Sequence, residues 1–318
     1  MKASILIPAY NAAQYLEATL LSCADQGADV IEEIIVVDDH SEDDSQAVFS
    51  RVAKAHPEFA WKWFTNPNKG ACSARNHALT MATGDWIQWL DADDILGTFK
   101  IRTQLNSLGC DSLSCCVSPF VPFVGSTKTG LFQDDRNWNC PTTISGADWL
   151  ASGRMTIPAC WIGPKAVFDQ AGPWDESLKI NQDGEYFSRV LAKAESVFFE
   201  SEVNVWYRRG VSGSVSQFTS EKAESLFASV DSIHRTALAL EDSPRMRLMV
   251  ANRYQYAIYT SYPHYPEGLE KAKKELRNLP KPTISNPNAV SPLSKFISNV
   301  FGWKALTQLR LLLNKRKL

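Results

Sequence analysis

Residues 86–96 read "WIQWLDADDIL", an aromatic and aliphatic run that ends in three aspartates, Asp91, Asp93 and Asp94. The run up to Leu90 is typical of a strand buried within a sheet. In an extended conformation alternate side chains point the same way, so Asp91 and Asp93 would face one ligand. The stretch therefore predicts a strand that leaves the core and reaches a site.

The stretches on the amino-terminal side repeat this pattern. "SILIPAY", residues 4–10, is an apolar run stopped by a proline, and "EEIIVVDDHS", residues 32–41, has the same shape. Apolar residues at helical spacing follow each run, with Asn11 as the expected N-cap of the first helix. A third strand at 61–64 and a helix beyond "NPNKG" precede residue 86. Alternating strands and helices predict a mostly parallel α/β sheet with right-handed crossovers.

In such a sheet, ligands bind beyond the carboxyl ends of the strands. That rule places Tyr10, Asp38, Asp39 and the aspartates from Asp91 on one rim. A carboxylate at Asp38 or Asp39 would accept hydrogen bonds from a base or ribose, or would cap the next helix instead.

Beyond residue 100 the pattern is looser. It predicts a helix over 100–108, strands over 113–117, 197–199 and 203–207, and a hairpin within 120–133. We expect a catalytic domain over 1–215, with a nucleotide-binding half over 1–100 and an acceptor half over 101–215. A helical extension over 216–278, a proline-bearing linker over 279–292 and a basic amphipathic tail over 293–318 should follow.

Composition bounds the class of protein. The 318 residues are 44% hydrophobic and 21% charged with a formal net charge of −2, which is ordinary for a soluble enzyme and does not suggest a nucleic-acid partner. The seven cysteines include no CxxC pair and indicate buried hydrophobes in a reducing compartment. The start "MKASILIPAYN" lacks the pattern of a signal peptide and no segment has the apolar length of a membrane span, so we expect a cytoplasmic chain.

The three aspartates are hard oxygen donors suited to Mg²⁺ or Mn²⁺, which usually takes one or two protein carboxylates and completes its shell with water and phosphate oxygens. An isolated D-x-D is more often a solvated turn or a helix cap. Here the carboxylates follow a buried strand and would repel one another unless a cation lay near, which favours a metal.

Two further stretches carry charged groups. In "NKGACSARN", Gly70 permits close backbone approach and the cations Lys69 and Arg75 would face phosphates, although such residues at a helix start are usually only solvated. In "NQDGEYFSR", Asp183 or Glu185 would serve as a general base, or as an ordinary partner of the helix dipole. No G-x-G-x-x-G, P-loop or G-x-S-x-G pattern follows a strand, which disfavours dinucleotide-binding, NTPase and α/β-hydrolase functions.

Taken together, "SILIPAYN", "IIVVDDHSEDDS", "NKGACSARNHAL", "TGDWIQWLDADD" and "QDGEYFSR" resemble the family 2 glycosyltransferases, inverting enzymes with the GT-A fold. The likeness runs from about Ala3 to Arg209. It implies transfer of a sugar from a nucleotide-diphosphate sugar, with a UDP-sugar as the expected donor. The acceptor would be the hydroxyl of a saccharide or a lipid-linked molecule, in cell-envelope polysaccharide or glycolipid synthesis.

The resemblance also implies residue roles. Asp39 would contact the base, Asp93 would be the direct metal ligand with Asp91 beside it, and Asp183 would be the catalytic base. The remaining nucleotide-sugar contacts would come from Pro8, Ala9, Tyr10, Asn11, Lys69, Gly70, Arg75 and Ala92. The "GPWDE" segment and its surroundings imply an acceptor side made of Trp161, Trp174, Asp175 and Glu176.

Two positions leave alternatives open. Where many members have Glu-Asp before the catalytic helix, this chain has Gln182 and Asp183, so the choice between Asp183 and Glu185 as base stays open. Arg208 and Arg209, in "YRRGVSGSVS", look like the flexible loop that closes on the diphosphate in relatives, or are simply solvated.

The tail from residue 293 to 318 has six Lys or Arg residues, no acid and apolar residues interleaved. Such a helix can lie on an anionic membrane, giving peripheral contact with the inner face, or can pack against the catalytic domain. Two alternatives to a glycosyltransferase remain, a sugar nucleotidyltransferase and a catalytically inactive nucleotide-sugar-binding relative. The first would need a Gly-rich phosphate loop where this chain has "PAYNAAQY".

Overall fold

The computed structural model describes residues 1–109, 113–125, 141–154, 156–210 and 218–315. The chain divides into two compact units. The first comprises Met1–Trp149, Arg154–Glu176 and Arg189–Val215, and the second comprises Leu150–Gly153, Ser177–Ser188 and Ser216–Leu318.

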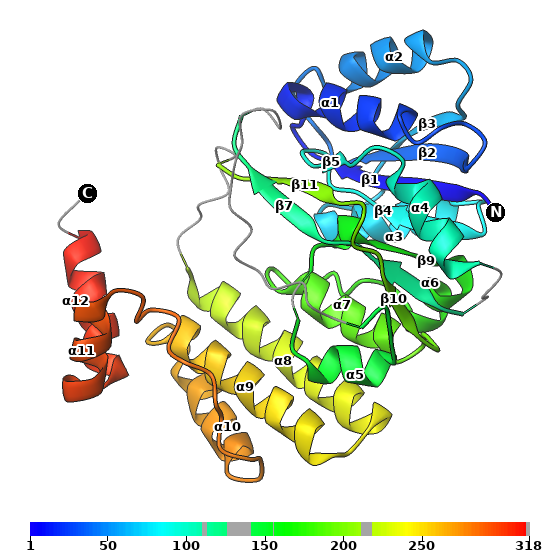
Figure 1. Ribbon diagram of the computed structural model, residues 1–318. Helices are drawn as coiled ribbons and strands as arrows, with labels where there is room; N and C mark the ends of the chain where they lie inside the picture. Colours follow the sequence, from blue (N-terminus) through cyan, green and yellow to red (C-terminus); the bar gives the residue numbers. More distant parts are fainter. Residues whose placement is uncertain (110–112, 126–140, 155, 211–217, 316–318) are drawn as a thin grey trace. The chain divides into compact units, whose positions relative to one another are not determined.

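The first unit holds both sheets (Figure 1). An eight-stranded sheet has the order β3-β2-β1-β4-β9-β6-β10-β8, and a three-stranded sheet has the order β5-β11-β7. The strands are β1 (Ala3–Ala9), β2 (Ile31–Asp38), β3 (Trp61–Thr65), β4 (Trp86–Trp89), β5 (Ile95–Leu96), β6 (Cys115–Val117), β7 (Phe120–Phe123), β8 (Thr143–Ile144), β9 (Trp161–Pro164), β10 (Val197–Phe199) and β11 (Val205–Arg208).

The strands from β1 to β4 are parallel, and β1, β2 and β4 are deeply buried, as their apolar runs predict, whereas β3 is only partly buried. The side chains of Ile5, Leu6 and Ile7 have no exposed surface, because helices and neighbouring strands cover both faces of β1. The mostly parallel α/β sheet with a helical carboxyl-terminal region is confirmed. One departure is β9, which runs antiparallel between β4 and β6.

Helices connect the strands of the first unit. Helices α1 and α2 lie side by side (Figure 1), and α3 packs against β1 and β2. The helices are α1 (Ala13–Ala24), α2 (Ser45–Ala55), α3 (Ala71–Met81), α4 (Lys100–Leu108), α5 (Gly146–Ala151), the short 3₁₀ helix η1 (Pro158–Cys160), α6 (Lys165–Ala171) and α7 (Gln182–Leu191), of which α5 and α7 cross between the units.

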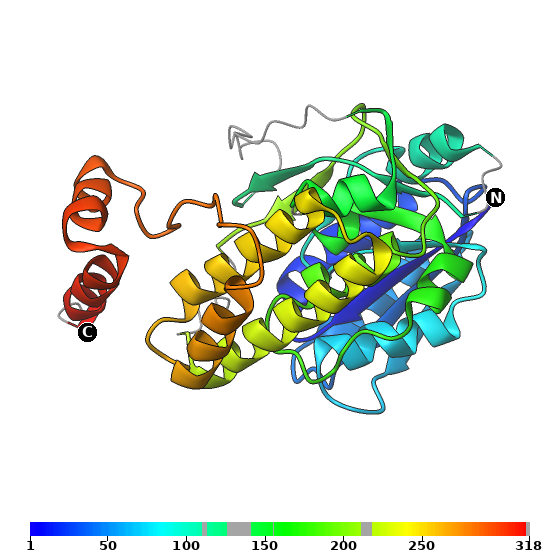
Figure 2. The same ribbon diagram turned by 90° about the horizontal axis from the view of Figure 1, so that it is seen from below.

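The second unit is helical. Figures 1 and 2 show α8 (Ser220–Leu240) and α9 (Pro244–Ser261) side by side, with α10 (Pro266–Leu276) next to them. The expected tail is two helices, α11 (Pro292–Phe301) and α12 (Trp303–Lys315), because Gly302 adopts a φ of 82° that interrupts a single helix. No helix in the described ranges has the length and apolar character needed to cross a membrane.

Two details differ from the local predictions. Strand β7 pairs in parallel with β11, and the rest of the expected hairpin lies outside the described residues. Asn11 does not cap α1: it has a φ of 47°, and its side-chain oxygen accepts from Glu42 N at 2.8 Å. The carboxylate of Asp43 instead accepts from Ala13 N at 2.9 Å, a partner about thirty residues away that local spacing cannot indicate.

Candidate active site

The carboxyl end of β4 continues into a tight turn, which we call the Asp91 turn (residues 91–94). The strand stops at Trp89, and the backbone N–H of Asp94 donates to the Asp91 carbonyl at 3.1 Å. Thr19 of α1 fixes the turn by donating from its hydroxyl to the carbonyls of Ala92 (2.9 Å) and Asp94 (2.8 Å). The aspartates therefore do not keep the extended alternation expected from the sequence.

Arg75 is the first positive charge at this turn. Its Nη2 donates to Asp91 Oδ1 at 2.8 Å, and its guanidinium lies 4.7 Å from the centre of the Trp174 ring. Only 8% of the Arg75 side chain is exposed, compared with 30% for Asp91. Helix α3 thus brings a buried cation to the end of β4, where the ion pair offsets part of the repulsion between the aspartates.

Asp93 lies between Asp91 and Asp94 in sequence and is partly buried. Burial, together with the neighbouring charge of Asp91, raises the pKa of Asp93 to about 6, while the cation of Arg208 acts in the opposite direction. In the described part of the molecule no side chain donates a hydrogen bond to its carboxylate. The Asp93 carboxylate is partly buried and no protein cation in the described residues is bonded to it, so it is suited to bind a metal ion.

Asp94 has a structural role that the sequence did not indicate. Its side chain is fully buried and Oδ1 accepts from the backbone N–H of Arg208 at 2.9 Å, which ties β11 to the Asp91 turn. Burial, with the charges of Asp91 and Asp93, raises the pKa of Asp94 well above its usual value. The turn leads directly into a short strand, β5.

Arg208 is the second positive charge at the turn. It ends β11, and its Nε donates to the Asp93 carbonyl at 2.8 Å. Its guanidinium lies between two aromatic rings, 4.8 Å from that of Tyr15 and 4.5 Å from that of Phe123. Arg208 thus belongs to a strand, and residues 211–217 of the expected flexible loop lie outside the described residues. Arg209 is exposed and its backbone N–H donates to the Phe123 carbonyl.

A cavity of about 230 Å³ opens beside the Asp91 turn, at the carboxyl ends of β1, β2 and β4. We call it the Asp93 cavity. It brings together most of the residues predicted to bind a nucleotide sugar and adds three that the sequence did not single out, Ala12, Tyr15 and Ala71. The lining residues are Pro8, Ala9, Tyr10, Asn11, Ala12, Tyr15, Asp39, Ala71, Arg75, Asp91, Ala92 and Asp93.

The carboxylate of Asp39, on this rim, accepts hydrogen bonds from a backbone N–H. Both of its carboxylate oxygens accept from Gly70 N at 2.9 Å, and Oδ1 also accepts from Asn66 Nδ2 at 2.7 Å. Gly70 has a φ of 114°, which only glycine adopts without strain, so a glycine is needed to point this N–H at Asp39. Lys69 and Gly70 do not line the Asp93 cavity, and Asp38 accepts from Ser41 N.

The four residues expected on the acceptor side have unlike environments. Trp161 and Trp174 are each 1% exposed, so both indoles belong to the core. Trp161 Nε1 donates to Thr156, and Trp174 packs edge-on against Trp89. Trp174 nevertheless supports the site through its contact with Arg75. Asp175 and Glu176 are exposed, and Glu176 accepts from Asn76 Nδ2 at 3.0 Å.

The two candidate bases lie on helix α7, in the residues that belong to the second unit. Glu185 is 2% exposed and accepts from the hydroxyl of Ser232 at 2.8 Å, so it is engaged within its own unit. Asp183 is partly exposed. Asn181, with a φ of 58°, precedes the helix, and its side chain donates to Ser229 at 2.8 Å. Of the two carboxylates, Asp183 is therefore the more exposed.

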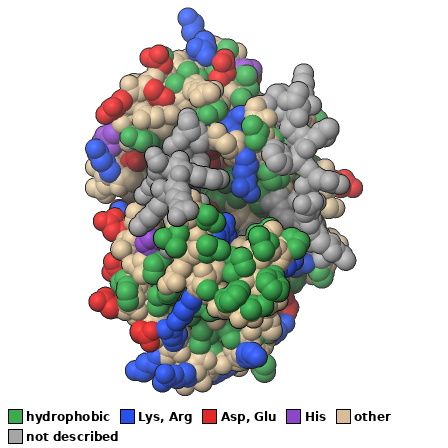
Figure 3. Space-filling view, turned by 90° about the vertical axis from the view of Figure 1, so that its left-hand side faces the viewer, with side chains coloured by type: hydrophobic (Ala, Val, Ile, Leu, Met, Phe, Trp, Pro, Cys, Tyr) green, Lys and Arg blue, Asp and Glu red, His purple; other side chains and the backbone are tan. Residues whose placement is uncertain are grey.

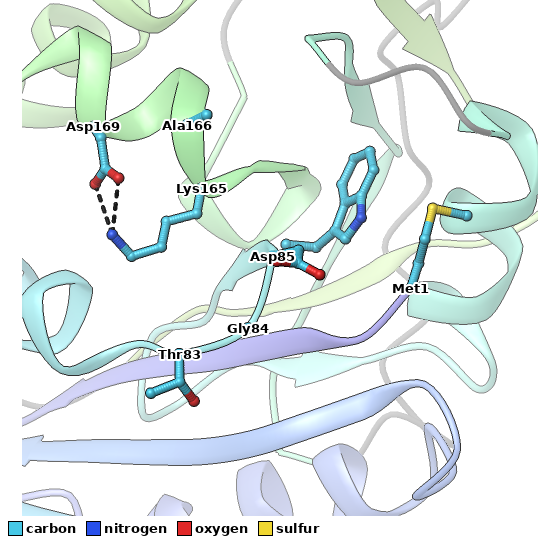
Figure 4. Close-up of a pocket in the computed structure, with 8 residues that line it drawn as sticks. Met1, Thr83, Gly84, Asp85, Lys165, Ala166 and Asp169 are labelled. Carbon is cyan, nitrogen blue, oxygen red and sulfur yellow. Dashed lines mark hydrogen bonds and ion pairs between the residues drawn. The ribbon is translucent and has the colours of Figure 1, made fainter.

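A larger cavity of about 580 Å³ lies at the opposite ends of the strands, beside Thr83, Gly84 and Asp85 (Figure 4). Its lysine, Lys165, points at Asp169 and the pair forms an i,i+4 ion pair at 2.8 Å. Because ligands of such sheets collect at the carboxyl ends of the strands, we assign the site to the smaller Asp93 cavity.

Comparisons with curated proteins return glycosyltransferases. An uncharacterized glycosyltransferase of Haemophilus influenzae is 39% identical over 103 residues, 32% of this chain and 40% of the relative. One of Rickettsia typhi is 30% identical over 205 residues, 63% of this chain and 61% of the relative. The chain thus spans roughly half of the length of these relatives.

Solved structures show the same fold. TarS of S. aureus (residues 1–349) superposes with a TM-score of 0.67 at 18% identity, covering 88% of this chain and 81% of that one. A mannosyltransferase of Pyrobaculum calidifontis in complex with GDP-Man and Mn²⁺ gives 0.55 at 14% identity, covering 99% and 88%. The family model for glycosyl transferase family 2 matches residues 4–172, more than half of the sequence. The chain therefore belongs to glycosyl transferase family 2.

Proposed function

We propose that the chain transfers a sugar, with inversion, from a nucleotide-diphosphate sugar to an acceptor hydroxyl. The observation that carries the proposal is the Asp93 cavity, where Asp39, Arg75, Asp91 and Asp93 converge from three different segments of the first unit. These groups suit a nucleotide-diphosphate sugar. One carboxylate can accept hydrogen bonds from the nucleoside, the buried cation can face the diphosphate, and two further carboxylates lie beside it.

The donor set at the Asp91 turn fits a divalent cation. Asp93 and Asp91 both line the cavity, whereas Asp94 faces Arg208 and is removed from the set. Two carboxylates match Mn²⁺ or Mg²⁺ that keeps water and phosphate oxygens in its shell. When bound, such an ion would neutralise charge on the departing diphosphate.

The protein's own groups would divide the rest of the reaction. Asp183 removes the proton from the acceptor hydroxyl, whose oxygen then bonds to the anomeric carbon as the bond from that carbon to the diphosphate breaks. Arg75 supplies a fixed positive charge on the cavity wall for the leaving group, and its contact with Trp174 and Asp91 keeps that charge in place.

The relatives support a role in cell-envelope synthesis. TarS has been solved with UDP-GlcNAc and with UDP, which favours a UDP-sugar as donor. A relative in Escherichia coli, 35% identical over 130 residues, is a UDP-Glc:alpha-D-GlcNAc-diphosphoundecaprenol beta-1,3-glucosyltransferase. We infer a saccharide or lipid-linked acceptor of that general kind.

Nucleoside diphosphate release from a panel of UDP- and GDP-sugars, measured with Mn²⁺ and with a chelator, tests the proposal. Release from at least one donor, dependent on metal and abolished in Asp93→Ala, is expected. Asp85→Ala, which changes an aspartate of the larger cavity, is the matched control and should behave as the parent. Two outcomes would each contradict the proposal. One is that the parent releases nucleoside diphosphate from none of the donors. The other is that calorimetry finds Asp93→Ala binding UDP and metal as the parent does.

A further inference from the structure

Helices α11 and α12 are attached to the second unit through one side of α12. The Trp303 indole packs edge-on against Tyr259 at 5.2 Å and Tyr262 at 5.3 Å between ring centroids, and Leu306 is only 2% exposed. Arg310 Nη1 donates to the Asn288 carbonyl at 3.0 Å. These contacts fix α12 within the unit, so the exposure of the remaining residues is set by the fold.

Beyond these contacts, the two helices expose large apolar side chains. No residue of α11 is buried, although its apolar residues recur at helical spacing. Hydrophobic side chains gather on this part of the surface, with Lys and Arg side chains near them (Figure 3). We define the tail face as Leu293, Phe296, Val300, Phe301, Leu309, Leu312 and Leu313, which are between 40% and 68% exposed. Soluble proteins rarely expose so many large apolar side chains together without a binding partner.

Charge identifies the partner. Residues 293–318 carry six Lys or Arg and no Asp or Glu. Lys295 is exposed among the apolar residues of α11, and Lys304 is exposed with its ammonium over the rings of Tyr262 and Trp303. Two copies of the chain joined through this face would bring like charges together, which opposes self-association. An apolar stripe edged by cations complements a layer of acyl chains beneath anionic headgroups.

We propose that the tail face docks the protein on an anionic lipid membrane, with α11 lying in the plane of the headgroups and α12 linking it to the second unit. The apolar side chains enter the acyl boundary, while the lysines stay at headgroup level because their stems are long enough to keep the ammonium in water. This inference stands independently of the proposed sugar transfer, because it concerns only where the chain binds.

Sedimentation of the full chain with vesicles tests the proposal. The parent should sediment with equimolar phosphatidylcholine and phosphatidylglycerol and remain in solution with phosphatidylcholine alone. The double variant Phe296→Glu/Phe301→Glu should bind the anionic vesicles at least roughly tenfold more weakly, since it puts charge into the apolar face. Lys295→Gln/Lys304→Gln should lose affinity by roughly fivefold per lysine.

The matched control is Leu21→Glu/Tyr256→Glu, which makes the same change of charge at two exposed apolar positions on α1 and α9 and should bind as the parent does. Circular dichroism confirms that each variant is folded. Three outcomes overturn the proposal: equal binding by the parent and Phe296→Glu/Phe301→Glu, equal binding to neutral and anionic vesicles, or a dimer in light scattering that this variant dissociates.

Discussion

Arg75 Nη2 and Asp91 Oδ1 are 2.8 Å apart, and this ion pair joins helix α3 to the turn after β4 beneath the Asp93 cavity. The pair explains how a buried strand can end in three aspartates. Arg75 and Arg208 supply positive charge at the Asp91 turn, so the three aspartates have protein cations beside them in the fold without the proposed metal. Removing either arginine would then affect folding and binding together.

Arg75→Ala should lower the free energy of unfolding by roughly 1.5–3 kcal/mol, because it breaks a charged hydrogen bond and leaves Asp91 next to Asp93 without its partner. It should also weaken UDP binding. Urea unfolding and calorimetry measure the two effects. Arg51→Ala is the control, since the Arg51–Glu17 pair is 60% and 53% exposed and should contribute under about 1 kcal/mol. Equal losses in the two variants would contradict the assignment.

Asp94 offers a second test of how the turn is held. Asp94→Asn keeps an oxygen that can accept from Arg208 N, and the burial that raises the pKa of Asp94 favours a neutral side chain at this position. Asp94→Ala removes the acceptor and should cost roughly 1–3 kcal/mol of stability, whereas Asp94→Asn should stay close to the parent. Urea denaturation at neutral pH distinguishes them. If both variants lose the same stability, the hydrogen bond to Arg208 is not what matters.

The strands at the rim were predictable because each is an apolar run buried on both faces, a pattern that depends only on nearby residues. The cavity walls at Pro8, Tyr10 and Asp39 follow from the carboxyl ends of those strands. The resemblance to the family, confirmed by the match over residues 4–172, added the roles that no spacing could assign.

The partners of these residues were not predictable in the same way. Asp94 and Arg208 are 114 residues apart in sequence and meet only because β5 pairs with β11. Trp174 lies in a segment that the resemblance places on the acceptor side, yet its ring is buried under Arg75, a contact between residues about a hundred positions apart. Both contacts join residues far apart in the sequence, and the local sequence around each residue does not indicate its partner.

The ionised carboxylate of Asp93 should lower the free energy of unfolding of the metal-free protein. Its carboxyl has a pKa of about 6 in the fold and the usual 3.8 when unfolded, so between these values the folded state binds more protons. Stability should therefore fall as pH rises from about 4 to 6, by up to about 3 kcal/mol. In metal-free protein at pH 7.5, Asp93→Asn should raise the melting temperature, and at pH 4 the gain should disappear.

The same change should abolish metal-dependent binding of UDP, because a neutral amide is a poor ligand for Mn²⁺. Calorimetric unfolding at the two pH values and binding titrations with Mn²⁺ check the two halves of this prediction. If Asp93→Asn is less stable than the parent at pH 7.5, the Asp93 side chain stabilises the fold through its contacts, and its ionised form does not destabilise the fold.

Asp183 and Glu185 give the test of the catalytic base. Asp183→Asn should abolish transfer while leaving metal-dependent UDP binding nearly intact, since the amide keeps the shape but cannot take the proton. Glu185→Gln should retain transfer and stay close to the parent in stability, because its amide oxygen can still accept from Ser232, whereas Glu185→Ala should lose roughly 1–3 kcal/mol. Steady-state transfer assays, UDP titration and urea denaturation of these variants separate the roles. Full activity in Asp183→Asn, or loss of transfer in a stable Glu185→Gln, would move the base to Glu185.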